Sequence, residues 1–196
     1  GNNDTSYLDI VTKKLVEYGV MIAKYRKEFI EYINKYITDI YASIFKSGEL
    51  KIKYVSSYKN KNASELLKNY QKNYCKEMEV GKTLLGIHHD DIEFVLDNNN
   101  LKEWGSEGQR KNAIISFKIA ELMVIKEIKN YYPILILDDL FSELDKEKIT
   151  NILKMLNEEV QTFITTTEIN KVDKKVIKKA KIFKVDSGNI KEDTNE

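Results

Sequence analysis

The sequence predicts an α/β fold in which a mostly parallel sheet is flanked by helices and an α-helical arm lies at the N-terminal end. Three observations predict it. An aliphatic run from Ile134 to Leu137 follows Pro133 and ends in two aspartates, which is typical of a strand buried on both faces of a parallel sheet. A second short apolar segment runs from Gln161 to Thr165. A long helical pattern, from Tyr7 to Phe45, opens the chain.

The predicted helix at 7–45 carries apolar residues that lie seven apart, with a second set between them. The first set is Leu8, Leu15, Ile22, Phe29 and Tyr36, and the second is Val11, Tyr18, Tyr25 and Tyr32. Such a helix would be about 60 Å long at 1.5 Å per residue. Further isoleucines, from Ile33 to Ile44, broaden the apolar stripe. This width favours a helix packed along a core over a free coiled coil.

Shorter elements follow in order along the chain. We expect strands at Leu50–Val55, Thr83–Gly86 and Ile92–Leu96, a helix from Ser64 to about Glu77, a helix from Lys146 to Leu156, and a final hairpin of 181–185 and 189–191. We divide the chain into a mainly helical arm domain (1–80), a second domain (81–191) and a disordered tail (192–196).

Composition narrows the class of protein. With 32 basic and 31 acidic residues, the net charge is +1, which exerts no global attraction on nucleic acid or a membrane surface. One cysteine, Cys75, excludes an intramolecular disulfide and fits a reducing compartment. No apolar run approaches the length of a membrane span, and no signal peptide is present. We expect a soluble, cytoplasmic protein.

The paired carboxylates Asp138 and Asp139 end the aliphatic run, at the edge of the sheet where α/β proteins place ligands. One interpretation is a Walker B strand, in which Asp138 holds Mg²⁺ through its water shell and Asp139 orients or deprotonates the attacking water. The other is a strand that ends in a turn with an aspartate helix cap. The short pattern alone leaves both open.

A second motif stands at the start of a predicted helix. Ser106, Gly108 and Gln109 precede an amphipathic run from Lys111 to Ile128. Free backbone N–H groups at the positive end of a helix dipole form an anion site, although a serine there is also an ordinary N-cap. Together with the downstream aspartate pair, the motif looks like the signature of ABC-type ATPases.

Four blocks carry a closer resemblance: 86–94, 105–110, 135–145 and 161–167. In this order they resemble the RecF family, DNA-repair ATPases related to the SMC proteins. The match has departures. Ile87 and His89 stand where the family has Pro and Arg, and Glu107 stands where its signature has Gln.

The resemblance implies the C-terminal lobe of an ABC-type ATPase head and a role for each matched residue. The catalytic residues would be Asp139 and Asp138, with Mg²⁺ held by Asp138. The nucleotide of a second subunit would be bound by Ser106, Gly108 and Gln109. The D-loop across the interface would contain Ser142 and Asp145, and the switch that contacts the γ-phosphate would be Thr166, within one residue. A hydroxyl donates one hydrogen bond but carries no charge, so this switch would be weaker than the histidine often found there.

The resemblance also implies ATP and Mg²⁺ as cofactors, an ATP-dependent homodimer, and binding to DNA at single-strand/double-strand junctions. Recombinational gap repair and recombinase loading with mediator proteins such as RecR would follow. Two alternatives stay open. An SMC-like structural ATPase head would need a much longer coiled coil than 7–45, and a non-enzymatic partner-binding module would need neither motif.

No Gly-x-x-x-x-Gly-Lys-Ser/Thr loop is present in the sequence. Gly81-Lys82-Thr83 has the last letters of such a loop but no glycine five residues earlier, and we expect a turn there. The chain begins with Gly1 instead of Met, and we expect the C-terminal half of a longer protein. The intact protein is expected to be a slow ATPase, whereas this part alone is expected to bind no ATP and to be inactive.

Two further clusters have open interpretations. His88-His89-Asp90-Asp91 offers metal-ligand atoms, but neighbouring residues on an extended chain point to opposite sides, which favours a structural or nucleotide-proximal role. Lysines recur from Lys171 to Lys181 in a predicted helix of about three turns. They form either a contact surface for DNA phosphates or a solvated helix face.

Overall fold

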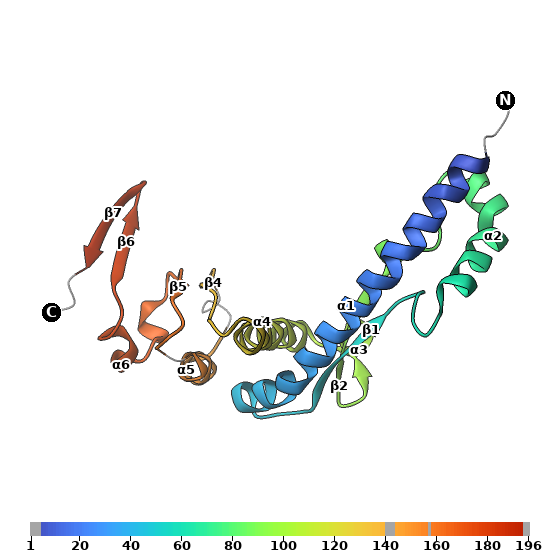
Figure 1. Cartoon of the computed structure of the whole chain (residues 1–196). Coiled ribbons are helices and arrows are strands. Elements are labelled where there is room, and N and C mark those ends of the chain that lie inside the picture. Colours follow the sequence, from blue (N-terminus) through green and yellow to red (C-terminus); the bar gives the residue numbers. More distant parts are fainter. Residues whose placement is uncertain (1–4, 140–143, 157, 194–196) are drawn as a thin grey trace.

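A computed structural model describes residues 5–139, 144–156 and 158–193, and the N- and C-terminal ends lie at opposite ends of an elongated molecule (Figure 1). The predicted arm helix is confirmed as α1 (Thr5–Phe45), 41 residues long. Helix α2 (Ala63–Val80) packs beside it. It begins one residue before the predicted Ser64, because Asn62 and Glu65 form a reciprocal capping box.

An antiparallel sheet lies against the second half of α1. Its strands are β1 (Leu50–Val55), as predicted, β2 (Asp91–Leu96) and β3 (Asn99–Asn100), in the order β1-β2-β3. The Asn34 side chain fixes β1 on the helix, since it donates to the carbonyl of Ile52 (2.8 Å) and accepts from its N–H (2.9 Å).

The predicted strand at Thr83–Gly86 is wrong. The backbone N–H groups of Leu84 and Leu85 donate to Oε1 of Glu77 at 2.7 and 3.3 Å, so a side chain on α2 takes the place of a neighbouring strand. A 3₁₀ turn, η1 (Ile87–His89), then leads into β2.

Helices α3 (Leu101–Trp104) and α4 (Glu107–Lys129) connect the antiparallel sheet to the parallel pair. Strands β4 (Leu135–Leu137) and β5 (Thr162–Ile164) pair in parallel, and α5 (Lys146–Met155) lies between them in sequence. The predicted parallel sheet is thus confirmed in this pair.

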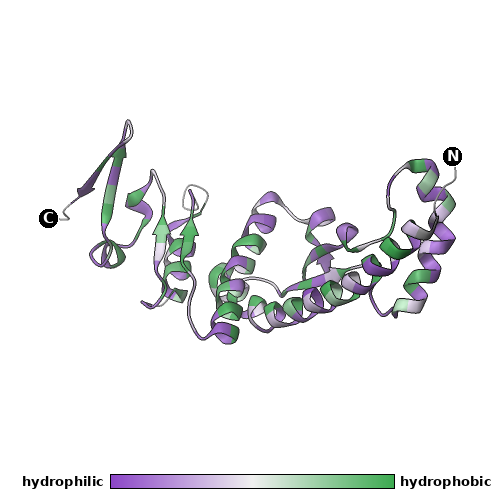
Figure 2. Cartoon of the chain, turned by 45° about the horizontal axis from the view of Figure 1, so that its top comes forward, coloured by the Kyte–Doolittle hydropathy of each residue, from purple (hydrophilic) through white to green (hydrophobic). Residues whose placement is uncertain are grey.

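The expectation that the aliphatic strand is buried on both faces is wrong for this chain. Leu135 and Leu137 are half-buried, but Ile136 is 69% exposed and Phe163 on β5 is 53% exposed. Both strands consist mainly of hydrophobic residues (Figure 2). Within the described part of the chain, only two strands form this sheet, so one of its apolar faces stays in contact with solvent.

The main core contains residues from Ile30 on α1 to Val172, which lie far apart in the sequence. Its largest members are Ile33, Ile37, Tyr41 and Ile44 on α1, Leu50 on β1, Ile119 on α4, and Ile149 and Ile152 on α5. The proposed division at residue 80 stays a prediction; this core draws residues from both sides of it. A smaller cluster of Val16, Tyr58, Leu66 and Tyr70 holds the first half of α1 against α2.

The lysine-rich segment forms two short helices, η3 (Ile169–Lys171) and α6 (Lys174–Ile177), instead of three continuous turns. The helix is interrupted because Val172 is buried in an extended conformation. The Asp173 side chain accepts from the N–H of Lys175 and so caps the new helix, which starts at Lys174.

The chain ends in the predicted hairpin, β6 (Ile182–Asp186) with β7 (Asn189–Asp193). Glu192 and Asp193, which we assigned to a disordered tail, pair instead with Phe183 and Ile182, and residues 194–196 lie outside the described part. In the described part, no helix combines the length and the apolarity needed to cross a bilayer.

Candidate functional site

The N-terminus of α4 forms the first half of the candidate site. Ser106 has an extended backbone and is the N-cap of α4: its Oγ accepts from the N–H of Gln109 (3.2 Å), and Oε1 of Gln109 accepts from the N–H of Ser106 (2.9 Å). This is a complete capping box. The two sequence interpretations of the serine are compatible, because a capping hydroxyl that accepts one bond can still donate its own proton to an anion.

Open space surrounds this helix end. Residues 106–110 are all exposed, and a Cβ added at Gly108 would meet no atom within 4 Å. Trp104, two residues before Ser106, is 77% exposed. A phosphate group could therefore approach the backbone of the first turn of α4 without displacing any side chain.

Glu107 introduces a negative charge at this candidate anion site, where the RecF family signature has Gln. Its carboxylate forms an ion pair with Lys111 one turn along α4 (2.9 Å), and this hydrogen bond lowers the pKa of Glu107. Glu107 is therefore ionised at neutral pH, and Lys111 offsets part of its repulsion toward an incoming phosphate.

The aspartate pair forms the second half of the site. Asp138 and Asp139 follow β4 and are exposed at its carboxyl end. The Thr165 hydroxyl, at the same end of β5, donates to Oδ1 of Asp138 and accepts from the N–H of Asp139 (2.9 Å). The parallel pairing places these residues together, since it aligns Leu137 with Ile164 and brings the next residues of both strands to one edge.

Thr165 occupies this place; it lies one residue before Thr166, within the one-residue range given for the switch, and Thr166 has a different contact. The Thr166 hydroxyl accepts from the N–H of Glu168 (2.9 Å) and so caps the following turn. The ends of the two apolar runs were the available signal: matched as parallel strands, they place Asp138 opposite Thr165. The switch role of Thr166 stays a prediction.

Of the two predicted D-loop residues, the structure describes only Asp145. Asp145 is the N-cap of α5 and accepts from the N–H of Lys148 (2.9 Å). Its side chain also forms an ion pair with the Lys148 ammonium group (2.8 Å), and these two bonds lower the pKa of Asp145. Ser142 lies outside the described residues.

A groove of about 160 Å³ lies between β4, which leads to the aspartate pair, and α4, which begins after Ser106. Ile114 and Lys118 on α4 line it together with the segment from Leu135 to Asp138. The helix that begins with the signature motif therefore packs, further along, beside the strand that ends in the aspartate pair. Both motifs belong to one lobe, and both are open to solvent.

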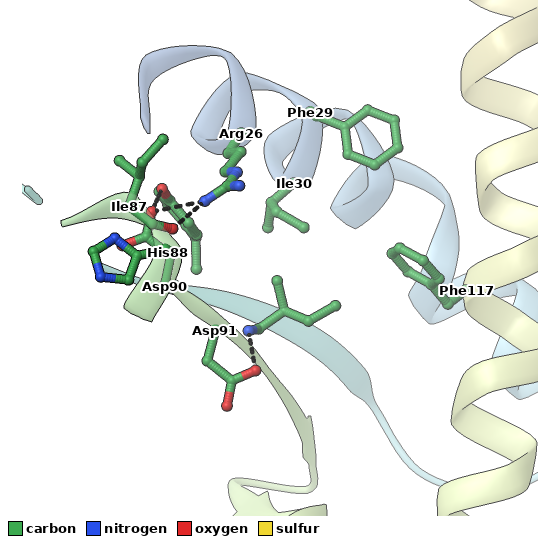
Figure 3. A pocket seen from close by; sticks show the side chains of 10 residues that line it. Arg26, Phe29, Ile30, Ile87, His88, Asp90, Asp91 and Phe117 are labelled. Atoms are coloured by element: carbon green, nitrogen blue, oxygen red, sulfur yellow. Dashed lines mark hydrogen bonds and ion pairs between the residues drawn. The ribbon is translucent and has the colours of Figure 1, made fainter. Parts of the chain in front are cut away.

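The cluster around Asp90 connects the arm to the sheet (Figure 3). The Asp90 side chain is 2% exposed, and its Oδ2 accepts from Nη1 of Arg26 on α1 (3.1 Å) and from the Tyr54 hydroxyl on β1. Arg26 also donates to the carbonyl of Ile87 (2.7 Å). Burial, with the bond to Asp90, raises the pKa of Tyr54. A cavity of about 350 Å³ lies beside this cluster.

These contacts favour the structural interpretation of the cluster. The rings of His88 and His89 lie 4.1 Å apart, and Nε2 of His89 lies 3.0 Å from the carbonyl oxygen of Thr83. Nowhere in the part of the chain that the structure describes do three or more His, Cys, Asp or Glu residues gather as a metal site.

Ion pairs involve part of the lysine-rich segment. Lys171 pairs with Glu168 (2.6 Å), and Lys179 pairs with Glu158 (2.7 Å). The ammonium groups of Lys174, Lys175 and Lys178 belong to a segment that is largely open to solvent. Both earlier interpretations, a DNA contact and a solvated face, therefore stay open.

Solved structures with the same fold identify the class of protein. The chain superposes with a TM-score of 0.80 on "Structure of the recombination mediator protein RecF-ATPrS in RecFOR pathway", at 25% identity over 97% of this chain and 52% of the other. A second structure, "Structure of the recombination mediator protein RecF-ATP in RecFOR pathway", gives the same TM-score at 24% identity. By fold, the chain resembles about half of these RecF structures: a lobe with a parallel strand pair, preceded by a long helical arm.

Curated relatives identify the family, although no family model matches. DNA replication and repair protein RecF of Ligilactobacillus salivarius is 38% identical over 98% of this chain, and its counterpart in Pediococcus pentosaceus is 35% identical over 94%. The chain belongs to the RecF family and corresponds to its C-terminal half. It spans about half the length of the curated relatives it matches, 53% and 52% for these two.

Proposed function

We propose that this chain provides part of a composite ATP site in a DNA replication and repair ATPase that dimerises on ATP. The N-terminus of α4 in one copy would bind the γ-phosphate of a nucleotide held by the other copy. The Ser106 hydroxyl and the backbone at Gly108 are the donors, and Gln109 holds the serine in place. The exposed, uncrowded first turn of α4 is the observation that supports this role most directly.

Asp138 and Asp139 would act on the nucleotide held by their own copy. Mg²⁺ prefers oxygen ligands, keeps several waters, and binds through one or two carboxylates together with substrate phosphates. The exposed carboxylate of Asp138, fixed by the Thr165 hydroxyl, fits this requirement. When bound, Mg²⁺ neutralises developing phosphate charge. Asp139 would orient the attacking water, while Asp145 and Ser142 would contact the partner copy.

The sequence has no phosphate-binding loop, so we expect the 196-residue chain alone to bind no ATP. Isothermal titration with ATP and Mg²⁺ tests this expectation. A saturable affinity near micromolar would show that the triphosphate is held by residues of this chain that we have not recognised.

The composite site is tested in the full-length protein with Ser106→Arg, which places a long cationic side chain at the helix end. We expect loss of ATP-driven dimerisation, measured by light scattering, and an unchanged monomer fold, measured by circular dichroism. Ser187→Arg is the matched control, because Ser187 lies in the exposed β6–β7 turn. Normal dimerisation of Ser106→Arg would remove the proposed role of α4.

Asp139→Asn tests the second half of the site. We expect slower ATP turnover and a longer-lived ATP-bound dimer, because the amide cannot take a proton from water. Turnover equal to that of the parent protein would exclude Asp139 as the catalytic carboxylate.

The ATP-bound dimer would bind DNA at single-strand/double-strand junctions in the cytoplasm. With mediator proteins such as RecR, it would promote recombinase loading in gap repair. The solved relatives are described as a recombination mediator protein in the RecFOR pathway, which supports this role. Fluorescence anisotropy with a gapped duplex, with and without ATP and at two salt concentrations, tests it. Junction binding that does not depend on ATP would contradict the coupling.

A further inference from the structure

The only tryptophan in the sequence, Trp104, lies two residues before Ser106 and is 77% exposed. Tryptophan is a large residue that is highly buried on average. Within the part of the chain that the structure describes, its indole ring forms no aromatic contact, no cation–π contact and no hydrogen bond. The packing of this chain therefore does not account for a tryptophan at this position.

The backbone holds Trp104 next to the N-cap of α4. Trp104 is the last residue of α3, whose first residue, Leu101, is buried. The N–H of Gly105 donates to the Leu101 carbonyl (3.1 Å), and a Cβ at Gly105 would lie only 2.6 Å from that oxygen. Only glycine fits this close approach, and the capping box of Ser106 follows at once. Hydrogen bonds thus fix the connection on both sides, and the indole is held beside the proposed phosphate donors.

This position is within reach of the nucleoside part of a nucleotide whose γ-phosphate binds at Ser106. Two residues of extended chain span at most about 7 Å, and the indole adds its own length. The ribose and base of such a nucleotide lie beyond the α- and β-phosphates, away from the helix end itself. A base presents a flat π-face, and its stacking on an aromatic side chain is a favourable contact that needs no hydrogen bond to the base edge.

We propose that Trp104 stacks on the base of the nucleotide held by the other copy and thereby strengthens the ATP-driven dimer. The inference rests on the proposed composite ATP site, and it adds a contact to the nucleoside that neither Ser106 nor the backbone at Gly108 provides. Because every base has a π-face, the contact contributes affinity without selecting adenine over guanine. It requires an aromatic ring, and an aliphatic side chain does not replace it.

Two variants of the full-length protein separate a stacking contact from plain apolar packing. Trp104→Tyr keeps an aromatic ring, and Trp104→Leu keeps an apolar side chain without one. Light scattering measures the ATP concentration at which half of the protein is dimeric. We expect this concentration to stay within about threefold of the parent value for Trp104→Tyr and to rise at least about tenfold for Trp104→Leu. The circular dichroism of both variants should be unchanged, because the ring is exposed.

Tyr131→Leu is the matched control, because it removes an exposed ring beyond the other end of α4 and should dimerise like the parent. Parent-like dimerisation of Trp104→Leu would overturn the proposal. The same holds if Trp104→Tyr is as weak as Trp104→Leu, because an aromatic ring is then not what the site requires. An equal loss in Tyr131→Leu would also overturn it, since the effect would not be specific to this position.

Indole fluorescence tests the contact directly, once any other tryptophan of the full-length protein is replaced by phenylalanine. Without ATP, the emission of Trp104 should be that of a solvent-exposed indole, and in the ATP-bound dimer the stacked base should quench it. A blue-shifted emission before ATP is added, or a blue shift without quenching in the dimer, would place the ring against protein and overturn the proposal.

Ser106→Arg distinguishes failure of this inference from failure of the proposed function. If Ser106→Arg still dimerises on ATP, the composite site is wrong and the stacking contact fails with it. If Ser106→Arg abolishes dimerisation while Trp104→Leu dimerises like the parent, the stacking contact alone is overturned.

Discussion

Replacing Asp90 by alanine removes the acceptor that Arg26 and Tyr54 share between the arm and the sheet. A hydrogen bond to a charged group contributes about 1.5–3 kcal/mol. The ion pair adds about 0–1 kcal/mol, since the Arg26 side chain is 45% exposed and solvent screens it. We therefore expect the free energy of unfolding to fall by about 1.5–4 kcal/mol. For a chain of this size, the melting temperature falls by roughly 3–16 °C.

The neighbouring Asp91 is the matched control. Its side chain is 57% exposed and pairs with Lys102, which is 80% exposed, so Asp91→Ala should cost at most about 1 kcal/mol. Thermal unfolding followed by circular dichroism measures both variants. If Asp91→Ala destabilises the chain as much as Asp90→Ala, the burial argument is wrong. Arg26→Ala added to Asp90→Ala should cost less than the two separate losses combined, because both remove one interaction.

Three further predictions concern single side chains. Asp145→Ala removes the cap of α5 and should cost about 0.5–2 kcal/mol at neutral pH. The bonds to Lys148 lower the pKa of Asp145 in the folded state. The contribution of the cap is therefore complete above about pH 3.9, the pKa of an unfolded aspartate, and is lost as the pH falls through the lower pKa of the folded state. The urea unfolding midpoints of variant and parent should converge in acid. Tyr70→Phe removes the bond from the Tyr70 hydroxyl to the Leu85 carbonyl (2.9 Å) and its bond with the Tyr58 hydroxyl (3.0 Å), and should cost about 0.5–1.5 kcal/mol at pH 7. Burial raises the pKa of Tyr70, so the parent, but not the variant, should lose this stabilisation as the pH rises above about 10; unfolding at pH 7 and pH 11 measures the difference. Gly108→Ala should leave the melting temperature of the chain unchanged or higher and should weaken ATP-driven dimerisation of the full-length protein.

Local signals predicted the long elements well. The spacing of apolar residues predicted α1, and the alternation from Leu50 to Val55 predicted β1 with its bounds. Short apolar segments were less informative. At Thr83–Gly86 the pattern fitted a strand, but the outcome depended on a carboxylate of α2 that no local pattern reveals. Long-range side-chain bonds of this kind cannot be read from neighbouring residues.

Burial was the least predictable property, because it depends on what covers each face. The aliphatic run before Asp138 carries the composition of a strand buried on both sides, yet Ile136 is exposed in this chain. Leu8 to Tyr25 have a similar excess of apolar residues over burial. In both places the apolar composition indicates burial that these 196 residues do not provide. The relatives, which are about twice as long, contain further residues.

Folding does not require glycine at position 108, whereas the proposed nucleotide contact does. Its backbone is helical, in the first turn of α4, and a Cβ there would meet nothing within 4 Å. Neither a positive φ nor crowding requires glycine, and glycine in a helix costs about 0.5–1 kcal/mol relative to alanine. The proposed close approach of a phosphate to the backbone would account for the glycine, because a methyl group would lie between the helix N–H groups and the phosphate. If Gly108→Ala raises the melting temperature and leaves ATP-driven dimerisation of the full-length protein intact, this explanation fails, and the helix end is only a cap.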